Sequence, residues 1–230
     1  SMPNCILIGS GPGIGSAVAR RFGGGGYRVG LIARSPENLA DQTEHLQRLG
    51  ISADWAVADA GDGAALEQAM AELIGRMGRC DVLIYNAAVM RPESPLALSG
   101  ERLMREFSVN VLGAHLAARM VAPGMVERGA GTILFTGGGL ALEPFAQWTS
   151  LALGKAALRS LGFSLFKELA PKGVRVCVIT ICGIVKRGEP FDADLIARQY
   201  WHVATGPRGE VKREVVFQPD GADLSYNAPN

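Results

Sequence analysis

Cysteine and histidine are scarce in this 230-residue chain. The four cysteines form no Cys-x-x-Cys pair, and the three histidines stand far apart along the sequence. A disulfide framework needs many cysteines in a short chain, and a zinc site needs closely spaced ligands. We therefore expect buried, reduced cysteines and no metal centre.

An excess of one charge and long apolar runs are missing as well. The chain has 23 basic and 22 acidic residues, a net charge of +1. No unbroken apolar stretch approaches the ~20 residues that span a bilayer. Nucleic-acid-binding proteins usually carry a basic excess, and membrane proteins carry such stretches. The sequence thus predicts a cytoplasmic protein that binds neither nucleic acid nor a membrane.

Apolar residues and glycine are plentiful. Hydrophobic residues make up 48% of the chain, and its 30 glycines are clustered rather than periodic. Short apolar runs alternate with segments of helical spacing, which favours an α/β fold: a Rossmann-type, doubly wound parallel sheet of about seven strands with helices on both faces. No linker interrupts residues 1–230, so we expect one domain. The expected strands are 4–8, 28–33, 52–58, 81–85, 132–136, 173–181 and 214–218, and the expected helices are 14–22, 36–49, 64–77, 99–127, 145–169 and 190–204.

A glycine-rich turn joins the first expected strand to the first expected helix. Gly9 would let the strand turn sharply, Gly13 would let backbone N–H groups approach a pyrophosphate, and Gly15 would let the helix pack closely. The positive end of the helix dipole would face the anion. The turn therefore predicts a dinucleotide site formed by Gly9, Ser10, Gly13, Ile14 and Gly15.

The end of the second expected strand indicates which dinucleotide binds. Sites for NAD or S-adenosylmethionine normally place a carboxylate there to bind the ribose hydroxyls. This chain instead has Arg34, nineteen residues after Gly15, followed by Ser35. A guanidinium and a hydroxyl suit a 2′-phosphate. The residues therefore favour NADP(H) over NAD(H) and argue against a methyltransferase.

Over essentially its whole length the chain resembles the short-chain dehydrogenase/reductase family. The turn has the family's G-x-x-x-G-x-G spacing, and further matches follow the third, fourth and sixth expected strands at Ala58-Asp59, Tyr85-Asn86-Ala87-Ala88 and Gly183. The resemblance implies that Asp59 borders the adenine ring and that Asn86 and Ala87 line the cofactor. It also implies that Gly183 lines the nicotinamide pocket.

The resemblance also locates a reactive centre from which two side chains are missing. The family uses a serine after the fifth strand, a tyrosine thirteen residues later, a lysine four residues further, and a helix asparagine that holds a proton-relay water. Lys155 and Asn110 match the lysine and the asparagine. The resemblance implies that both are catalytic and that Lys155 also binds the nicotinamide ribose. Gly138 and Leu151 occupy the serine and tyrosine positions. The chain resembles a divergent subgroup of the family in which the tyrosine is commonly phenylalanine and the lysine is kept.

These matches predict an NADP(H)-dependent oxidoreductase acting on an unknown substrate, such as an activated C=C or carbonyl compound. A positioned acid contributes ~10²–10⁴-fold to a rate, and Leu151 cannot donate a proton. Another donor is then needed, and the candidates are Thr149, Ser150 and Tyr200. The alternative is a catalytically inactive NADP(H)-binding sensor or partner subunit. Family members usually pair through their two long helices, so the resemblance also implies a homodimer or homotetramer.

Overall fold

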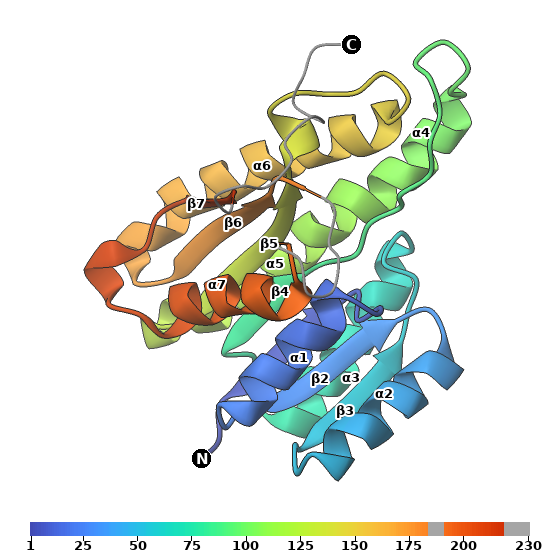
Figure 1. The fold of residues 1–230 in the computed structure, drawn as a ribbon. Helices are drawn as coiled ribbons and strands as arrows, with labels where there is room; N and C mark the ends of the chain where they lie inside the picture. The colour runs from blue at the N-terminus through green and yellow to red at the C-terminus, as the bar shows by residue number, and fades with distance from the viewer. Residues whose placement is uncertain (184–190, 219–230) are drawn as a thin grey trace.

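The computed structural model describes residues 1–183 and 191–218, which contain one seven-stranded sheet (Figure 1). The strands are β1 (Asn4–Ile8), β2 (Arg28–Ala33), β3 (Ala53–Val57), β4 (Val82–Tyr85), β5 (Thr132–Gly138), β6 (Arg175–Ile181) and β7 (Glu214–Phe217). Their order is β3-β2-β1-β4-β5-β6-β7, and every neighbouring pair is parallel. The chain reverses its direction across the sheet between β1 and β4, so the expected doubly wound Rossmann-type sheet is confirmed.

Helices cover both faces of this sheet. The helices are α1 (Ile14–Gly24), α2 (Pro36–Arg48), α3 (Gly63–Met77), α4 (Gly100–Phe107), α5 (Gly113–Arg128), α6 (Thr149–Leu169) and α7 (Ala193–Thr205). Local sequence fixes several of their starts. The side chains of Ser35, Asp62 and Ser99 each accept a hydrogen bond from a backbone N–H in the first turn of α2, α3 and α4.

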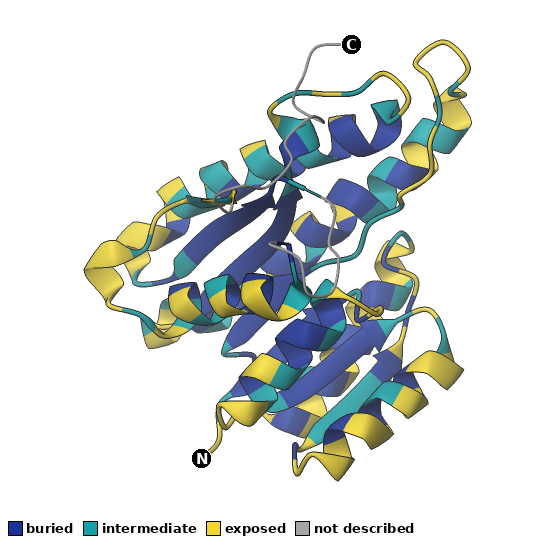
Figure 2. Ribbon diagram, viewed as in Figure 1, coloured by how far each residue is buried: buried dark blue, intermediate teal, exposed yellow. Residues whose placement is uncertain are grey.

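The core consists of two apolar layers, one on each face of the sheet. Helices α3, α5 and α6 pack on one face, around residues such as Leu73, Val121 and Leu158. Helices α1, α2 and α7 cover the other face, around Phe22, Leu39 and Ile196. Figure 2 shows the central strands buried, the edge strand β3 only partly buried, and the outer sides of the helices exposed. Burial on both faces explains why the strands are continuous apolar runs.

The long helical stretch expected at 99–127 is helical but not uniform. Helix α4 continues without a break into a π-helical turn, Ser108–Leu112, and then into α5. A π-helical turn widens the helix by one residue and is frequent at functional sites. Asn110 lies in its middle and is buried.

Helix α6 starts four residues later than expected. The segment before it, 145–148, lies against the loop after β4. The backbone N–H of Glu93 donates to the carbonyl of Gln147 at 2.7 Å, and the backbones of Glu93 and Trp148 form an isolated parallel β-bridge. This tertiary pairing overrides local helix propensity. The start expected for the last helix, Pro190, lies outside the described residues, and α7 begins at Ala193.

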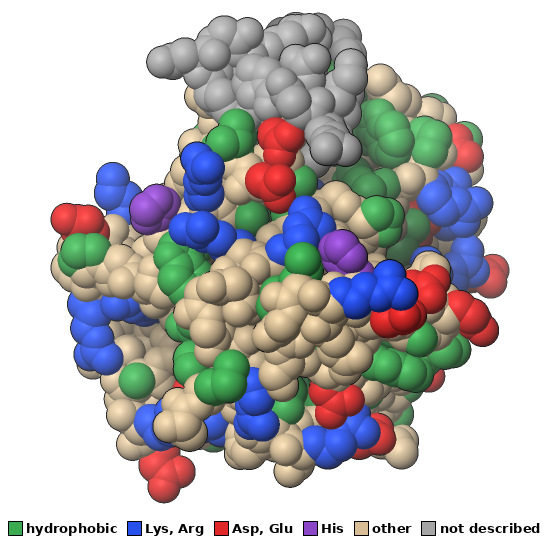
Figure 3. Space-filling view, turned by 60° about the horizontal axis from the view of Figure 1, so that its bottom comes forward, with side chains coloured by type: hydrophobic (Ala, Val, Ile, Leu, Met, Phe, Trp, Pro, Cys, Tyr) green, Lys and Arg blue, Asp and Glu red, His purple; other side chains and the backbone are tan. Residues whose placement is uncertain are grey.

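One described helical stretch, Gly100–Arg128, is long and apolar enough to cross a membrane by length and composition alone. Residues including Ala114, Ala117, Ala118 and Met125 are completely buried in the fold, as in the core helix of a globular domain. On the face shown in Figure 3, basic side chains lie among acidic ones.

Candidate functional site

The glycine turn brings β1, α1 and the loop after β4 into close contact. Gly9 has φ +89°, and a Cβ on it would lie 2.4 Å from the backbone nitrogen of Ala87. A Cβ on Gly15 would lie 2.8 Å from the carbonyl oxygen of Gly9. Real Cβ atoms do not approach backbone this closely, so only glycine fits at both positions. The turn and the first turn of α1 are thereby fixed as one unit.

The turn is open to space around Gly13. Gly13, immediately before α1, has φ +91°, and a Cβ there would meet no atom within 4 Å. Ser10 is completely buried, yet its hydroxyl has no hydrogen-bond partner. Helix α1 follows directly, with Ile14 as its first residue and no side-chain cap on its N-terminal N–H groups. Open space, uncapped N–H groups and an orphan hydroxyl suit the phosphates and hydroxyls of a dinucleotide.

Asn86 ties the turn to the centre of the sheet. Its backbone N–H donates to the carbonyl of Ile8 at 2.8 Å, and its side-chain amide donates to the carbonyl of Gly9 at 2.9 Å. Asn86, in the family-like segment after β4, therefore lies against the glycine turn. Gly183 follows β6, where a Cβ on it would lie 2.4 Å from the ring of Phe191.

The residues expected near the adenosine end follow β2 and β3. Arg34 is exposed immediately after β2 and makes no ion pair with the described part of the chain. The Ser35 hydroxyl caps α2 by accepting from the N–H of Asn38 at 3.2 Å, and it donates to the carboxylate of Glu37 at 3.3 Å. Asp59 is exposed after β3 and accepts from the N–H of Gly61 at 2.8 Å. The sequence has no carboxylate at the end of β2, but the structure places the carboxylate of Glu37 beside Ser35, one of the two residues proposed to bind the 2′-phosphate.

The expected reactive centre lies at the end of β5. Lys155 Nζ donates to the carbonyl oxygen of Thr136 at 2.8 Å, and burial lowers the pKa of Lys155 to about 8. A Cβ on Gly138 would lie 3.6 Å from Lys155 Cγ, an ordinary contact. Leu151, one helical turn before Lys155, is 8% exposed. Gly138 and Lys155 are thus neighbours, with no side chain on the glycine.

The three alternative proton donors differ in their surroundings. The Thr149 hydroxyl is exposed and donates to the carbonyl of Ala146 at 2.7 Å. The Tyr200 hydroxyl lies in the core, hydrogen-bonded to the Thr136 hydroxyl at 2.6 Å, and burial raises its pKa. Ser150 is buried, and its hydroxyl has no partner. Of the three, only Ser150 keeps an unengaged hydroxyl.

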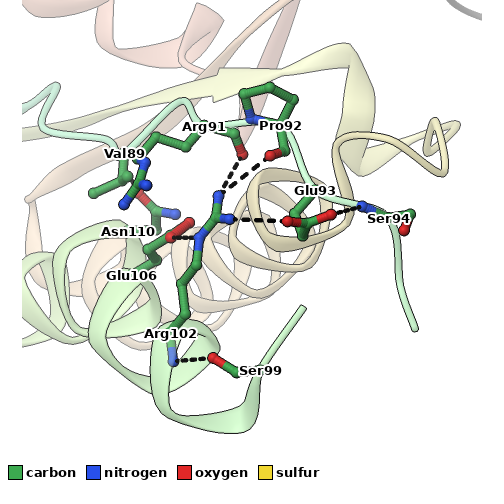
Figure 4. A network of polar contacts seen from close by, with 9 residues as sticks. All are labelled: Val89, Arg91, Pro92, Glu93, Ser94, Ser99, Arg102, Glu106 and Asn110. Atoms are coloured by element: carbon green, nitrogen blue, oxygen red, sulfur yellow. Dashed lines mark hydrogen bonds and ion pairs between the residues drawn. The ribbon is translucent and has the colours of Figure 1, made fainter. Parts of the chain in front are cut away.

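A buried acid near Asn110 was missed by the sequence analysis. Glu106 is 2% exposed, and one of its carboxylate oxygens accepts from Arg102 Nε at 2.8 Å while the other has no partner (Figure 4). Asn110 accepts from the N–H of Val89 at 2.8 Å, but its amide nitrogen has no partner. The signal that could have revealed Glu106 is its spacing, four residues before Asn110 on the same predicted helix.

Arg102 connects this helix to the loop after β4. Its guanidinium donates to the carbonyls of Arg91 and Pro92 at 3.1 and 3.4 Å and pairs with Glu93 at 3.5 Å. Within residues 1–183 and 191–218 there is no group of three or more histidine, cysteine or acidic residues that could hold a metal, and all four cysteines are buried thiols outside any disulfide.

The sheet order and the turn at its switch point define a protein of the Rossmann dinucleotide-binding class. A family model described as "short chain dehydrogenase" matches residues 4–189. The chain is 33% identical over 184 residues to 2,3-dihydro-2,3-dihydroxybenzoate dehydrogenase of Bacillus subtilis, covering 80% of this chain and 68% of that protein. The chain therefore belongs to the short-chain dehydrogenase/reductase family.

Other relatives agree with this placement. Dehydrogenase/reductase SDR family member 4 of Sus scrofa is 31% identical over 172 residues, which span 74% of this chain but only 62% of that protein. A metagenomic short-chain oxidoreductase, solved in complex with NADP, superposes with a TM-score of 0.87 at 27% identity. That superposition covers 94% of this chain and 96% of the other. These relatives are named as dehydrogenases and oxidoreductases, which supports an oxidoreductase class for the chain.

Proposed function

We propose that this protein is an NADP(H)-dependent oxidoreductase that acts on an activated C=C or carbonyl compound. The observation that carries the proposal is the combination of an open glycine turn, with the orphan Ser10 hydroxyl, and Lys155 at the end of β5. The solved relative that binds NADP adds support for the cofactor. Bound NADPH would supply a hydride.

The cofactor would be held by residues that follow five strands, β1, β2, β3, β4 and β6. The glycine turn, with Ser10 and Ile14, would bind the pyrophosphate, and Arg34 and Ser35 would bind the 2′-phosphate. Asp59 would border the adenine ring, while Asn86, Ala87 and Gly183 would line the remaining path to Lys155. Because the carboxyl ends of parallel strands meet at one edge of a sheet, these residues lie along a single rim.

Preference for NADPH would come from Arg34, opposed by Glu37. The Arg34 guanidinium can form charge-assisted hydrogen bonds with a phosphate. Glu37 draws the Ser35 hydroxyl away and adds a negative charge nearby. Calorimetric titration with NADPH and, separately, NADH tests this arrangement. We expect NADPH to bind at least tenfold more tightly, Arg34→Leu to remove the difference, and Glu37→Gln to enlarge it a few-fold.

Chemistry would be tested by NADPH oxidation with a panel of ketones, aldehydes and enones. NADPH binding followed by turnover supports the proposal. Absence of binding to either nucleotide would contradict it, because the turn would then be only a feature of the fold. Binding without turnover on any compound would favour the second candidate, an inactive NADP(H)-binding sensor or partner subunit. The absence of side-chain hydroxyls at Gly138 and Leu151 is the observation that favours that candidate.

The proposal extends to assembly and location. Met104, Leu112 and Leu153 are exposed on the outer sides of the α4–α5 stretch and α6, the helices through which family members usually pair. A homodimer or homotetramer would cover them. Leu158, by contrast, is core. Four reduced, buried cysteines suit the cytoplasm. Sedimentation of the purified protein would test the assembly.

A further inference from the structure

Four arginines line a cavity at the amino-terminal edge of the sheet, the edge opposite the proposed cofactor site. The cavity has a volume of about 560 Å³ and lies between the starts of β4, β5 and β6 and the ends of α5 and α7. Its arginines are Arg79, Arg128, Arg175 and Arg208, and one acidic residue, Asp81, lines it with them. Four arginines and one aspartate give this lining a net charge of +3, in a chain whose net charge is only +1.

The segments around this arginine cavity are distant in sequence but held together. Val82, Thr132 and Arg175, at the starts of β4, β5 and β6, are partners in the register of the sheet. Figure 1 shows α5 and α7 ending on the same side of the molecule, beside these strand starts. Arg208, which follows α7, donates to the carbonyl of Gly129, which follows α5, at 3.2 Å. The cavity is therefore a built feature of the fold and not a gap beside one loop.

Three of the four arginines have no counter-charge. Arg79 Nε pairs with the Asp81 carboxylate at 2.8 Å, so these two charges offset each other. In the part of the chain that the structure describes, no carboxylate pairs with Arg128, Arg175 or Arg208. Burial and the positive charge of Arg208 lower the pKa of the Arg175 guanidinium, so these two cations lie close enough to repel each other.

Backbone carbonyls hold the three guanidinium groups in place without neutralising them. Arg128 donates to the carbonyl of Cys80 at 3.0 Å, and Arg175 donates to the carbonyl of Val203 at 2.8 Å, in addition to the bond from Arg208 to Gly129. A guanidinium has five N–H donors, so each keeps donors for a ligand. Neutral donors could make the same bonds to carbonyls, and the fold alone therefore does not explain the three charges.

A phosphate group fits this arrangement. Guanidinium groups bind phosphate oxygens through charge-assisted hydrogen bonds, often two at a time. Groups that are already anchored lose little freedom on binding, which favours affinity. An oxyanion shared by Arg128, Arg175 and Arg208 would also relieve the repulsion between the last two.

The rest of the cavity has room and apolar surface for an organic group. Its volume lies within the ~300–1,000 Å³ that small-molecule sites usually have. Tyr27 and Val82 line it together with the arginines. The Tyr27 ring is held edge-on against Phe22 and Trp201, with ring centroids 5.2 and 5.8 Å away. An aromatic ring held in this way offers a fixed apolar contact.

We propose that this cavity binds a small organic phosphate monoester. Arg128, Arg175 and Arg208 bind its phosphate group, and its organic part lies against Tyr27. The site is separate from the glycine turn, which lies at the carboxyl ends of the strands, and the inference does not rest on the proposed oxidoreductase function.

Calorimetric titration of the full chain with phenyl phosphate and, separately, with inorganic phosphate tests the proposal. Phenyl phosphate carries the phosphate group and an apolar ring, whereas inorganic phosphate carries the anion alone. We expect phenyl phosphate to bind about tenfold more tightly, because its ring gains the contact with Tyr27. Equal or weaker binding of phenyl phosphate would overturn the assignment of an organic ligand, and no binding of either compound would overturn the site.

Arginine variants locate the bound phosphate. Arg175→Gln and Arg208→Gln should each weaken phenyl phosphate binding by on the order of tenfold, because each removes a charged donor. Arg208 is exposed, so Arg208→Gln decides the matter if Arg175→Gln does not fold. The matched control is Arg48→Gln, which removes an arginine on α2 that pairs with Glu44 and lies outside the cavity. It should change the affinity by less than about twofold.

The same variants separate this site from the proposed cofactor site, where a phosphate compound could also bind. Loss of phenyl phosphate binding in Arg208→Gln, with unchanged affinity for NADPH, supports the arginine cavity. Unchanged phenyl phosphate affinity in both cavity variants, or an equal loss in Arg48→Gln, overturns the proposal. Failure of the wild type to bind NADPH would contradict the proposed function and leave the result for the arginine cavity standing.

Discussion

The two halves of the sheet differ in how much of a dehydrogenase they retain. In the half formed by β1 to β4, the glycine turn, Asn86 and the Arg34 position are all present and mutually supported by backbone contacts. Around β5 to β7 and the helix before them, Lys155 and Asn110 match the positions that the family resemblance predicts, but Gly138 and Leu151, at the predicted serine and tyrosine positions, carry no hydroxyl.

The proposed binding groups and the proposed reactive groups therefore depend on different kinds of structure. The cofactor half depends on backbone geometry, in which a Cβ on Gly9 or Gly15 would collide with backbone atoms. A change there would disrupt the turn itself. The reactive groups are side chains on a rim, and their loss leaves the sheet and α6 intact. The comparison is therefore tested most sharply by disrupting the glycine turn of the first half and by restoring the missing hydroxyl groups of the second half.

Repairing the second half should have the largest effect. Gly138 has an extended backbone, φ −152°, that any residue adopts, and a Cβ there makes only ordinary contacts with Lys155. We expect Gly138→Ser combined with Leu151→Tyr to raise ketone reduction by ~10²–10⁴-fold, the usual contribution of a positioned acid. NADPH oxidation under saturating cofactor measures the gain.

The matched control for this repair is Gly138→Ala combined with Leu151→Phe. It adds nearly the same volume without either hydroxyl group. Equal rates for the two double variants would mean that packing, not proton donation, limits the reaction. If both double variants stay as slow as the wild type, Lys155 does not lie within reach of a tyrosine at position 151.

Breaking the first half should have the next largest effect. Gly13→Ala and Gly11→Ala both add a methyl group where no atom lies within 4 Å, but only Gly13 has a positive φ, +91°. The strain on Ala at position 13 costs about 1–3 kcal/mol. We expect NADPH binding to weaken by on the order of 10²-fold in Gly13→Ala. The backbone strain at position 13 and the methyl group, which keeps the pyrophosphate away from the backbone N–H groups, would both oppose binding.

Calorimetry measures this loss, with Gly11→Ala as the control from the same turn. Gly11→Ala should bind NADPH within about threefold of wild type, since surface changes without strain typically alter free energies by about 0.5 kcal/mol. Similar losses in both variants would show that the turn contacts the cofactor along its whole length rather than through Gly13.

The cofactor half was largely predictable from sequence because its signals are local. A strand, a glycine turn and a helix follow one another within twenty-odd residues, and Ser35 caps α2 as its position indicates. Glycine at positions 9 and 15 is required by contacts that the spacing alone suggests. The spacing could not show that the Glu37 carboxylate accepts a hydrogen bond from the Ser35 hydroxyl, beside the proposed phosphate position.

The reactive half was less predictable because its features depend on packing between distant segments. No glycine or proline marks the π-helical turn at Ser108–Leu112, and segment 145–148 leaves the helix only because Glu93 pairs with it. Glu106 looks like one of many helical glutamates in the sequence, and only the structure shows that it is buried. The resemblance located Lys155, but not the burial that lowers its pKa.

Lys155 gives the smallest expected effect, one of stability rather than activity. Burial lowers the pKa of Lys155 to about 8, against about 10.4 in an unfolded chain. Below pH 8 the native state must hold a partly buried charge. Between about pH 8 and 10.4 the unfolded chain binds the extra proton, so this group makes stability rise with pH. We therefore expect Lys155→Met to be more stable than wild type at pH 7 by about 1–3 kcal/mol.

That advantage should disappear as the pH rises through the window. Urea unfolding of both proteins between pH 7 and 10 measures the difference in the free energy of unfolding. Burial raises the pKa values of Cys5 and Cys80, so they lower stability in both proteins as the pH rises, and the comparison cancels their effect. A constant difference across this range would mean that Lys155 keeps an ordinary pKa.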